Sequence, residues 1–219
     1  MTLKFGYWNL RGMGEPIRLL MEYLEIPYEW KEYTPATANE WFEQDKINLG
    51  IDFPNLPYVI DGDFKTSQTQ TILKYLGRKY GMFGGQTNEE IAKQEALMDN
   101  VFDFRTRFAM ICYGIGDFEA KKKEFLDALP TRLQYYEDWL ASRKWLIGDK
   151  LFVGDFLFWS GLDAIACLEP SYLDKFPNVT KYKKEIEVIP QIEKFLKSDK
   201  FAKFPVNGPS AQWGGGASG

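Results

Sequence analysis

The sequence of 219 residues predicts an α/β domain followed by an all-helical domain. As far as Gly81, short strand-like apolar runs alternate with helical patterns, whereas beyond it apolar residues recur only at helical spacing. A break rich in glycine and polar residues, 84–88, separates the two patterns. We therefore expect the order β-α-β-α-β-β-α within residues 1–83 and helices only within residues 89–219.

The first three elements are predicted at the start of the chain. Leu3–Trp8 is typical of a strand, and two closely spaced glycines then interrupt it. Pro16 suits the first turn of a helix, in which apolar residues follow at intervals of three and four. Pro27 ends this helix, and Tyr28–Tyr33 is the second predicted strand.

Trp41–Lys46 is the next predicted element, a short helix. A proline-marked loop then leads into a third strand, and Asp61–Asp63 is typical of the turn of a hairpin. Phe64–Lys65 is the partner strand in this prediction. Thr66 or Ser67 is expected to cap the helix that completes the first domain.

Helical periodicity dominates the second domain. The predicted helices cover residues 89–113, 120–142, 156–168, 179–189 and 191–196. The final run, Gly214–Gly219, is expected to be a flexible tail.

The composition limits the possible chemistry. The chain contains no histidine, so Ser-His-Asp and Cys-His mechanisms are excluded and the commonest metal ligand is missing. The two cysteines, Cys112 and Cys167, form no Cys-x-x-Cys motif, which argues against a zinc site or a dithiol redox centre. A net charge of −4 makes nucleic acids and anionic membranes poor partners. We expect no metal cofactor.

The expected location is cytoplasmic. The segment Met1–Phe5 lacks the apolar stretch of a signal peptide. The sequence contains no run of about 18 uncharged apolar residues, so we expect no membrane span. One disulfide is formally possible, but two free thiols in a reducing compartment are favoured for a chain of this size.

Several segments resemble, in order and over essentially the whole chain, the mu class of glutathione transferases. They are Gly6–Gly12, Phe53–Tyr58 with Ile60–Gly62, Thr69–Leu76, Cys112–Tyr113, Gly148–Lys150 and Ala211–Trp213. The resemblance implies a thioredoxin-like first domain and a homodimer. It also implies an enzyme of detoxification that uses glutathione as co-substrate and conjugates it to small hydrophobic electrophiles.

Three features depart from the pattern of the class. The loop Thr34–Glu40 is short, as in some invertebrate members, including those of flatworms. The usual Gln-Ser pair is Gln68-Thr69. Phe152 stands where a Ser or Thr normally caps the helix of the buried Asp155, and the missing oxygen should cost roughly 1 kcal/mol if nothing replaces it.

The resemblance assigns Tyr7 as the catalytic residue. A thiol with a pKa near ~8.5 is only about 3% ionised at pH 7. A hydrogen bond from the Tyr7 phenol to the thiolate would contribute roughly 1.5–3 kcal/mol and lower the thiol pKa by about one to two. A tyrosinate base is disfavoured because an unperturbed phenol titrates near ~10. The alternative is that Tyr7 is an ordinary aromatic residue of a strand.

The resemblance also implies a set of glutathione-binding residues. Pro57 matches a cis-proline, whose geometry would let the Leu56 backbone pair with the cysteinyl backbone of glutathione. Gln68 and Thr69 open a helix whose free amides favour the γ-glutamyl carboxylate, although plain capping is the alternative. Lys46 supplies charge for the glycyl carboxylate, unless it is simply a solvated lysine. The other matched residues are Trp8, Met13, Trp41 and Asn55.

An electrophile pocket is expected between the two domains. Tyr113 can donate a hydrogen bond to an oxyanion that develops there. The matched lining comprises Leu10, Met13, Ala109, Tyr113 and the segment Val206–Gly208, which includes Asn207. Core packing is an equally open alternative for each apolar member, and the identity of the electrophile is left open.

Two residues are expected to act at a dimer interface. Phe53 matches an aromatic residue that inserts between helices of the partner, the alternative being a place in a small core of its own chain. Asp103 matches an aspartate that reaches across the two-fold axis to the γ-glutamyl ammonium group. The alternatives are a solvated carboxylate or a pair with Arg107, whereas Arg105 is expected to point elsewhere.

The leading hypothesis is therefore an enzyme that conjugates glutathione. The alternative is a carrier of hydrophobic ligands, or a structural protein, on the same fold with weak or absent catalysis. A thiol oxidoreductase is disfavoured, because no cysteine lies at the first strand–helix turn.

Overall fold

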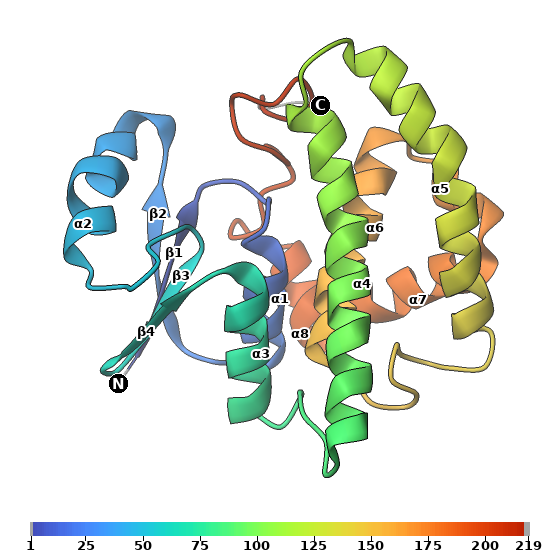
Figure 1. Cartoon of the computed structure of the whole chain (residues 1–219), viewed down its shortest axis with the longest axis horizontal. Coiled ribbons are helices and arrows are strands. Elements are labelled where there is room, and N and C mark those ends of the chain that lie inside the picture. The colour runs from blue at the N-terminus through green and yellow to red at the C-terminus, as the bar shows by residue number, and fades with distance from the viewer. Residues whose placement is uncertain (1, 217–219) are drawn as a thin grey trace.

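The computed structural model describes residues 2–216 and contains a four-stranded mixed sheet in the order β2-β1-β3-β4 (Figure 1). Strand β1 pairs parallel with β2 and antiparallel with β3, which pairs antiparallel with β4. The bounds are β1 Leu3–Trp8, α1 Glu15–Tyr23, β2 Tyr28–Tyr33, β3 Tyr58–Asp61, β4 Phe64–Ser67 and α3 Thr69–Lys79.

The second half of the chain is helical, and the predicted fold class is confirmed (Figure 1). Helix α4 begins after Thr87, whose side chain accepts from the Glu90 amide while the Glu90 carboxylate accepts from the Thr87 amide. The bounds are α4 Asn88–Tyr113, α5 Phe118–Leu140, α6 Val153–Leu168, η3 Tyr172–Lys175, α7 Pro177–Glu187 and α8 Pro190–Leu196.

Helices of both halves pack together in layers. Figure 1 shows α1 and α3 on the face of the sheet that is turned towards α4, with the α2 region on the opposite side. Helix α6 contacts α1, α3 and α4, and its residues are buried almost all round. A helix that is apolar on every side belongs inside a protein, so α6 is the centre of the common core.

The segment between β2 and β3 is more irregular than predicted. It contains a 3₁₀ turn η1 (Pro35–Thr37), a π-helical stretch η2 (Glu40–Asp45) and a short α2 (Lys46–Asn48). The predicted helix Trp41–Lys46 is therefore confirmed in place but not in type. Trp41 packs its indole on the ring of Tyr58 and holds this segment against the sheet.

Two expected helix ends are wrong. Strand β4 continues to Ser67, so the predicted cap at Thr66 or Ser67 does not exist, and Gln68 precedes the first residue of α3. The Ser67 hydroxyl instead donates to the Phe53 carbonyl oxygen. Helix α1 ends at Tyr23, before Pro27, because Glu25 takes a φ of 51° and the Ile26 amide donates back to the Met21 carbonyl oxygen at 2.9 Å.

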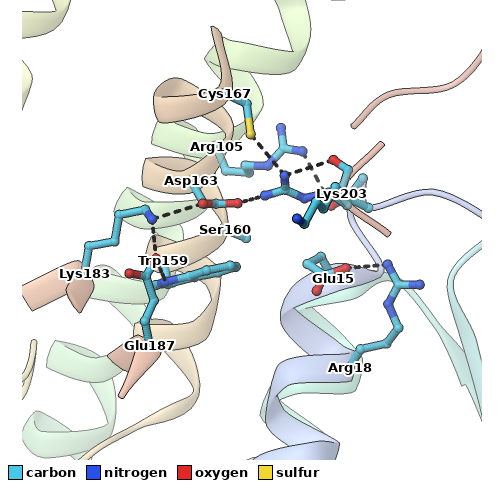
Figure 2. Close-up of polar contacts among 12 residues, drawn as sticks. Glu15, Arg18, Arg105, Trp159, Ser160, Asp163, Cys167, Lys183, Glu187 and Lys203 are labelled. Carbon is cyan, nitrogen blue, oxygen red and sulfur yellow. Dashed lines mark hydrogen bonds and ion pairs between the residues drawn. The ribbon is translucent and has the colours of Figure 1, made fainter. Parts of the chain in front are cut away.

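Buried ion pairs join the two halves. The Arg11 guanidinium, which follows β1, pairs with Asp163 on α6 and donates to the Cys167 sulfur at 3.1 Å. Asp163 also accepts from Lys183 on α7, 3.0 Å away, and Lys183 pairs in turn with Glu187 (Figure 2). The two cysteines are free thiols, as predicted.

Asp155 is a fully buried hydrogen-bond acceptor near the start of α6. Its carboxylate accepts from the amides of Leu146 at 3.0 Å and Phe152 at 2.8 Å, and from the Tyr182 hydroxyl at 2.7 Å. Burial raises the pKa of Asp155 to about 6, although the three donors act in the opposite direction.

The predicted loss of the cap at Phe152 is half compensated. Phenylalanine has no side-chain acceptor, and the Asp155 amide donates instead to the Phe152 carbonyl oxygen at 3.0 Å. The reciprocal bond of a capping box, from the Phe152 amide to Asp155, is present. The ring of Phe152 is fully buried and stacks on Phe83, so packing takes the place of the missing oxygen.

The last described residues are partly fixed. The Asn207 amide donates to the Gly214 carbonyl oxygen at 2.9 Å, so the predicted flexible tail does not begin at Gly214. The rest of that prediction, residues 217–219, lies outside the described residues. Within residues 2–216, no helix combines the length and the hydropathy that a membrane crossing requires.

Candidate active site

Tyr7 lies at the end of β1 and its ring rests against the turn that follows. The side chain is only 6% exposed, and the Tyr7 hydroxyl accepts a hydrogen bond from the Met13 amide at 2.8 Å. A β-carbon added at Gly12 would lie 2.5 Å from this hydroxyl, and one at Gly14 would lie 2.3 Å from the ring. The two glycines therefore permit the close approach of the phenol to the turn.

The Tyr7 hydroxyl is arranged to donate its proton. The Met13 amide occupies one acceptor position, and no described residue accepts from the hydroxyl. Burial raises the pKa of Tyr7, while the Met13 amide and the charges of Arg105 and Arg18 act in the opposite direction. The group is thus a neutral phenol at neutral pH, which is the state that the sequence analysis favours over a tyrosinate.

The turn after β1 is held by backbone and side-chain bonds from both halves of the chain. The amides of Arg11 and Gly12 donate to the carbonyl oxygens of Pro205 and Val206, each at 3.0 Å. The Met13 carbonyl oxygen accepts from the Thr69 hydroxyl on α3, also at 3.0 Å. The position of the turn, and hence of the Tyr7 hydroxyl, depends on residues distant in sequence.

The Leu56-Pro57 peptide bond is cis, as the resemblance implies. It precedes β3, whose neighbour in the sheet is the strand of Tyr7. Asn55 is exposed, and its side-chain oxygen accepts from the Leu56 amide at 2.9 Å. A second cis bond, Phe204-Pro205, was not among the expectations and lies next to the segment that binds the turn.

The start of α3 provides amides for an anion. Gln68 has a φ of 76°, an uncommon value for a residue other than glycine, and its side chain is exposed. Thr69 is buried and bonds to the Met13 carbonyl oxygen. The first amides of a helix have no acceptor within it, and here they open beside the turn that carries Met13.

Three further residues expected to bind glutathione divide into buried and exposed groups. Trp41 is 3% exposed and belongs to a small core with Tyr33 and Tyr58. Lys46 is exposed, with its ammonium 5.9 Å from the ring of Phe42. Trp8 is half-buried, and its ring lies 6.0 Å from that of Phe42.

Three of the expected pocket residues gather at the turn. A β-carbon at Gly208 would lie 3.2 Å from the Tyr113 hydroxyl and 3.9 Å from Leu10, and the Tyr113 hydroxyl accepts from the Gly208 amide. Ala109 lies one helical turn before Tyr113 on α4. Asn207 is only 2% exposed and its side-chain amide donates to the Trp213 carbonyl oxygen, so the side chain is directed into the C-terminal segment.

Asp103 and Arg105 point to different sides of α4. Asp103 is exposed, and no described cation lies within 4.0 Å of it, so the alternative pair with Arg107 does not form. Arg105 is 2% exposed and approaches the Gly12 carbonyl oxygen at 3.5 Å. Residues two apart on a helix do not share a face, so Asp103 is directed away from the Tyr7 of its own chain.

Sequence reasoning missed Arg105 as a neighbour of Tyr7. A signal exists, because the buried positions of α4 include Val101, Arg105, Phe108 and Cys112 at intervals of three and four. An arginine in a buried stripe demands an explanation, since arginine is almost never fully buried unless paired. Arg11, which had no predicted role, joins the two halves of the chain through Asp163.

A cavity of about 1150 Å³ lies away from Tyr7, between the 81–86 segment, α4 and the end of α5. Neither Tyr7 nor the turn after it lines this cavity, so the chemistry is not assigned to it. Among residues 2–216, no three His, Cys, Asp or Glu side chains gather closely enough to hold a metal ion.

Comparison with known proteins agrees with this arrangement. Residues 3–78 match the family of the glutathione S-transferase N-terminal domain, and residues 102–199 match that of the C-terminal domain. The chain is 41% identical over 219 residues to glutathione S-transferase Mu 6 of Mus musculus, covering 98% of this chain and 99% of the relative. It is 42% identical over 211 residues to the class-mu 26 kDa isozyme of Schistosoma japonicum, covering 96% and 95%. The solved structure of the glutathione S-transferase Blo t 8 superposes with a TM-score of 0.87 at 33% identity, covering 96% of this chain and 99% of that one.

Proposed function

The chain belongs to the mu class of the glutathione S-transferase family, and we propose that Tyr7 is the residue that activates glutathione. The observation that carries this proposal is the bond from the Met13 amide to the Tyr7 hydroxyl. It occupies an acceptor position of the hydroxyl and leaves the proton for a ligand. A glutathione sulfur at this place receives that proton in a hydrogen bond.

Such a bond lowers the pKa of the glutathione thiol, because the bond to the thiolate is stronger than the bond to the neutral thiol. A hydrogen bond to an ionised group contributes roughly 1.5–3 kcal/mol, and only the thiolate form of the sulfur accepts it strongly. The thiol pKa then falls from ~8.5 by about one to two, so that about a quarter to three quarters of the bound thiol is ionised at pH 7. The thiolate attacks the electrophile without a general base.

The residues around Tyr7 suit the other groups of the tripeptide. We propose that Leu56 and cis-Pro57 receive the cysteinyl backbone, and that Gln68 and Thr69 receive the γ-glutamyl carboxylate. The start of α3, whose first amides no side chain caps, and the exposed Gln68 side chain support this. The remaining proposed contacts come from Trp8, Met13, Trp41, Lys46 and Asn55.

The electrophile is proposed to lie where Leu10, Tyr113 and Gly208 meet. Leu10 supplies apolar surface, and the Tyr113 side chain is 46% exposed, so a ligand can reach it. The Tyr113 hydroxyl accepts from the Gly208 amide, and its own proton is available to an oxyanion on an epoxide or enone. Ala109 completes the apolar side on α4.

Retention on immobilised glutathione, followed by turnover of chloro-dinitrobenzene, tests the proposed function. We expect both retention and turnover. Retention without turnover would support the carrier hypothesis and contradict the proposed role of Tyr7. No retention would contradict the whole proposed glutathione site.

We propose a homodimer in which Phe53 enters the partner. Phe53 is 81% exposed, although the Ser67 hydroxyl holds its carbonyl oxygen in place, so an ordered loop presents an aromatic ring to the outside. A cavity of about 480 Å³ lies between α4 and α5, and Phe104, Tyr135 and Tyr136 are among its lining residues. Its size and aromatic lining suit a phenylalanine ring from a second copy.

Phe53→Ala is expected to weaken the dimer about thirtyfold or more, because a central aromatic anchor contributes about 2 kcal/mol or more. Sedimentation at micromolar concentration measures the shift towards monomer. Ile115→Ala is the matched control, since Ile115 is a fully exposed large apolar residue away from the proposed interface. A Phe53→Ala dimer that sediments like the wild type would contradict the proposal.

We propose that Asp103 binds the γ-glutamyl ammonium group of the partner's glutathione. Asp103 directly precedes Phe104 on α4, and Phe104 lines the cavity proposed for Phe53. Its direction away from its own Tyr7 also favours a contact across the interface.

Asp103→Asn is expected to raise the glutathione KM about tenfold, equivalent to ~1.4 kcal/mol, with a smaller effect on kcat. Mixing this variant with an excess of Tyr7→Phe subunits forms hybrids in which the intact Tyr7 belongs to the Asp103→Asn chain and receives a native Asp103 from its partner. One site per hybrid should regain normal affinity. Verified hybrids without high-affinity activity would show that Asp103 acts within its own subunit or not at all.

The domain division and the location are likewise proposals. We propose domains at residues 1–83 and 89–219, supported by the segment between α3 and α4 that belongs to neither helix. A cytoplasmic location is supported by the free state of Cys112 and Cys167.

A further inference from the structure

One peptide group connects a buried cation with the proposed catalytic phenol. The Gly12–Met13 peptide donates through its N–H to the Tyr7 hydroxyl at 2.8 Å. The carbonyl oxygen of the same peptide faces the Arg105 guanidinium at 3.5 Å. A charge on the helical domain and the hydroxyl on β1 therefore lie at the two ends of a single amide dipole.

Arg105 differs from the other buried arginines of the site. Arg11 pairs with Asp163. Arg18 pairs with Glu15 (Figure 2). Arg105 is equally buried, but no described carboxylate lies within 4.0 Å of it, and its Nε and Nη1 have no hydrogen-bond partner among the described residues. The guanidinium carbon of Arg105 lies 5.3 Å from the centre of the Phe108 ring.

An unpaired buried charge is costly for the fold. Its desolvation amounts to several kcal/mol, which no opposite charge offsets here. Burial accordingly lowers the pKa of Arg105. With no described carboxylate beside it, the charge of Arg105 acts on the Gly12–Met13 peptide, whose carbonyl oxygen it faces.

We propose that Arg105 polarises the Gly12–Met13 peptide and so strengthens the hydrogen bond that Tyr7 donates to the glutathione thiolate. The inference rests on the proposed role of Tyr7. A cation at a carbonyl oxygen makes the N–H of that amide a stronger donor, and a hydroxyl that accepts a stronger bond donates a stronger one in turn. Arg105 is thus a positioning residue, because it acts on the sulfur through Tyr7.

Other charged and titratable groups face the same two residues. Tyr113 on α4 and Arg18 on α1 act on Tyr7, and Arg11 and Cys112 lie near Arg105. None of them contacts the Gly12–Met13 peptide through its side chain among the described hydrogen bonds. The variants below leave all four unchanged.

Arg105→Met tests the relay through the thiolate absorbance of bound glutathione measured against pH. We expect the midpoint to rise by about one pH unit, which lowers kcat/KM about tenfold below the midpoint. The rate at high pH should approach that of the wild type. Arg105→Lys keeps the charge, so the midpoint of its thiolate titration should lie close to that of the wild type. Arg107→Met removes the same charge from an exposed position of α4 and is expected to change nothing.

A double variant separates the relay from a direct effect of the charge on the sulfur. In a Tyr7→Phe background, Arg105→Met should change the midpoint little, because the path through the hydroxyl is already absent. A full additional rise there would overturn the relay. An unchanged midpoint in Arg105→Met alone would also overturn it while leaving the role of Tyr7 intact. A wild-type complex that titrates like free glutathione would instead refute the role of Tyr7, and the relay with it.

Discussion

Replacing Asp155 with alanine is expected to lower the free energy of unfolding by about 3 kcal/mol. The change leaves the amides of Leu146 and Phe152 and the hydroxyl of Tyr182 without their acceptor in the protein interior. Each unsatisfied buried donor costs about 1–3 kcal/mol, and release of the buried charge offsets part of the sum. Urea denaturation monitored by tryptophan fluorescence measures the loss.

Two further variants keep this prediction testable if Asp155→Ala does not fold. Tyr182→Phe removes one of the three donors and should cost about 1 kcal/mol. Asp174→Ala removes an exposed carboxylate and should stay within about 0.5 kcal/mol of the wild type. Equal denaturation midpoints for Tyr182→Phe and the wild type would show that Asp155 does not organise this part of α6.

The second large effect is expected from Tyr7→Phe. The variant should lower kcat/KM about tenfold to a hundredfold, because the lost bond to the thiolate contributes ~1.5–3 kcal/mol. The glutathione KM should change little, since the groups proposed to hold the tripeptide remain. The thiolate absorbance of the bound complex against pH is the direct measurement.

Tyr80→Phe provides the matched control, because its side chain is 40% exposed and it lies beyond the end of α3. It should bind, titrate and turn over like the wild type. An unchanged thiolate titration in Tyr7→Phe would remove Tyr7 from the catalytic role, whatever the rate.

The regular elements follow closely from the sequence. Strands β1 and β2 have their predicted bounds, and α4 begins one residue before its predicted start because Thr87 and Glu90 form a capping box. These elements carry strong local signals, namely periodicity and caps. The cis bond before Pro57 came only from the resemblance, because cis geometry has no local signal.

The start of α3 and the segment before β3 depend on tertiary contacts instead. Register pairs Tyr58 with Ser67, so the hairpin extends through the residues that a local rule assigns to a cap. Gln68 then takes a φ of 76° to begin the helix. The π-helical Glu40–Asp45 is fixed by the packing of Trp41 on Tyr58, a contact between residues that no local pattern relates.

In the candidate site, too, some positions follow from the sequence and others depend on tertiary contacts. Tyr7 and Leu10 lie beside Gly12 of the turn, and Tyr113 lies beside Gly208, whereas the position of Arg105 depends on how α4 crosses the first domain. Sequence spacing places Arg105 in a buried stripe, but only the packed structure brings it to the carbonyl oxygen of Gly12.

The bonds from Arg11 and Gly12 to Pro205 and Val206 also set an order of events during synthesis. A ribosome that adds about 5–20 residues per second adds Arg11 to the chain about 10–40 s before it adds Pro205. The sheet and its helices have time to form in that interval, but the turn beside Tyr7 has no acceptors for these two amides. A nascent chain stalled before residue 205 therefore contains Tyr7 but lacks Pro205 and Val206, whose carbonyl oxygens hold the turn beside Tyr7.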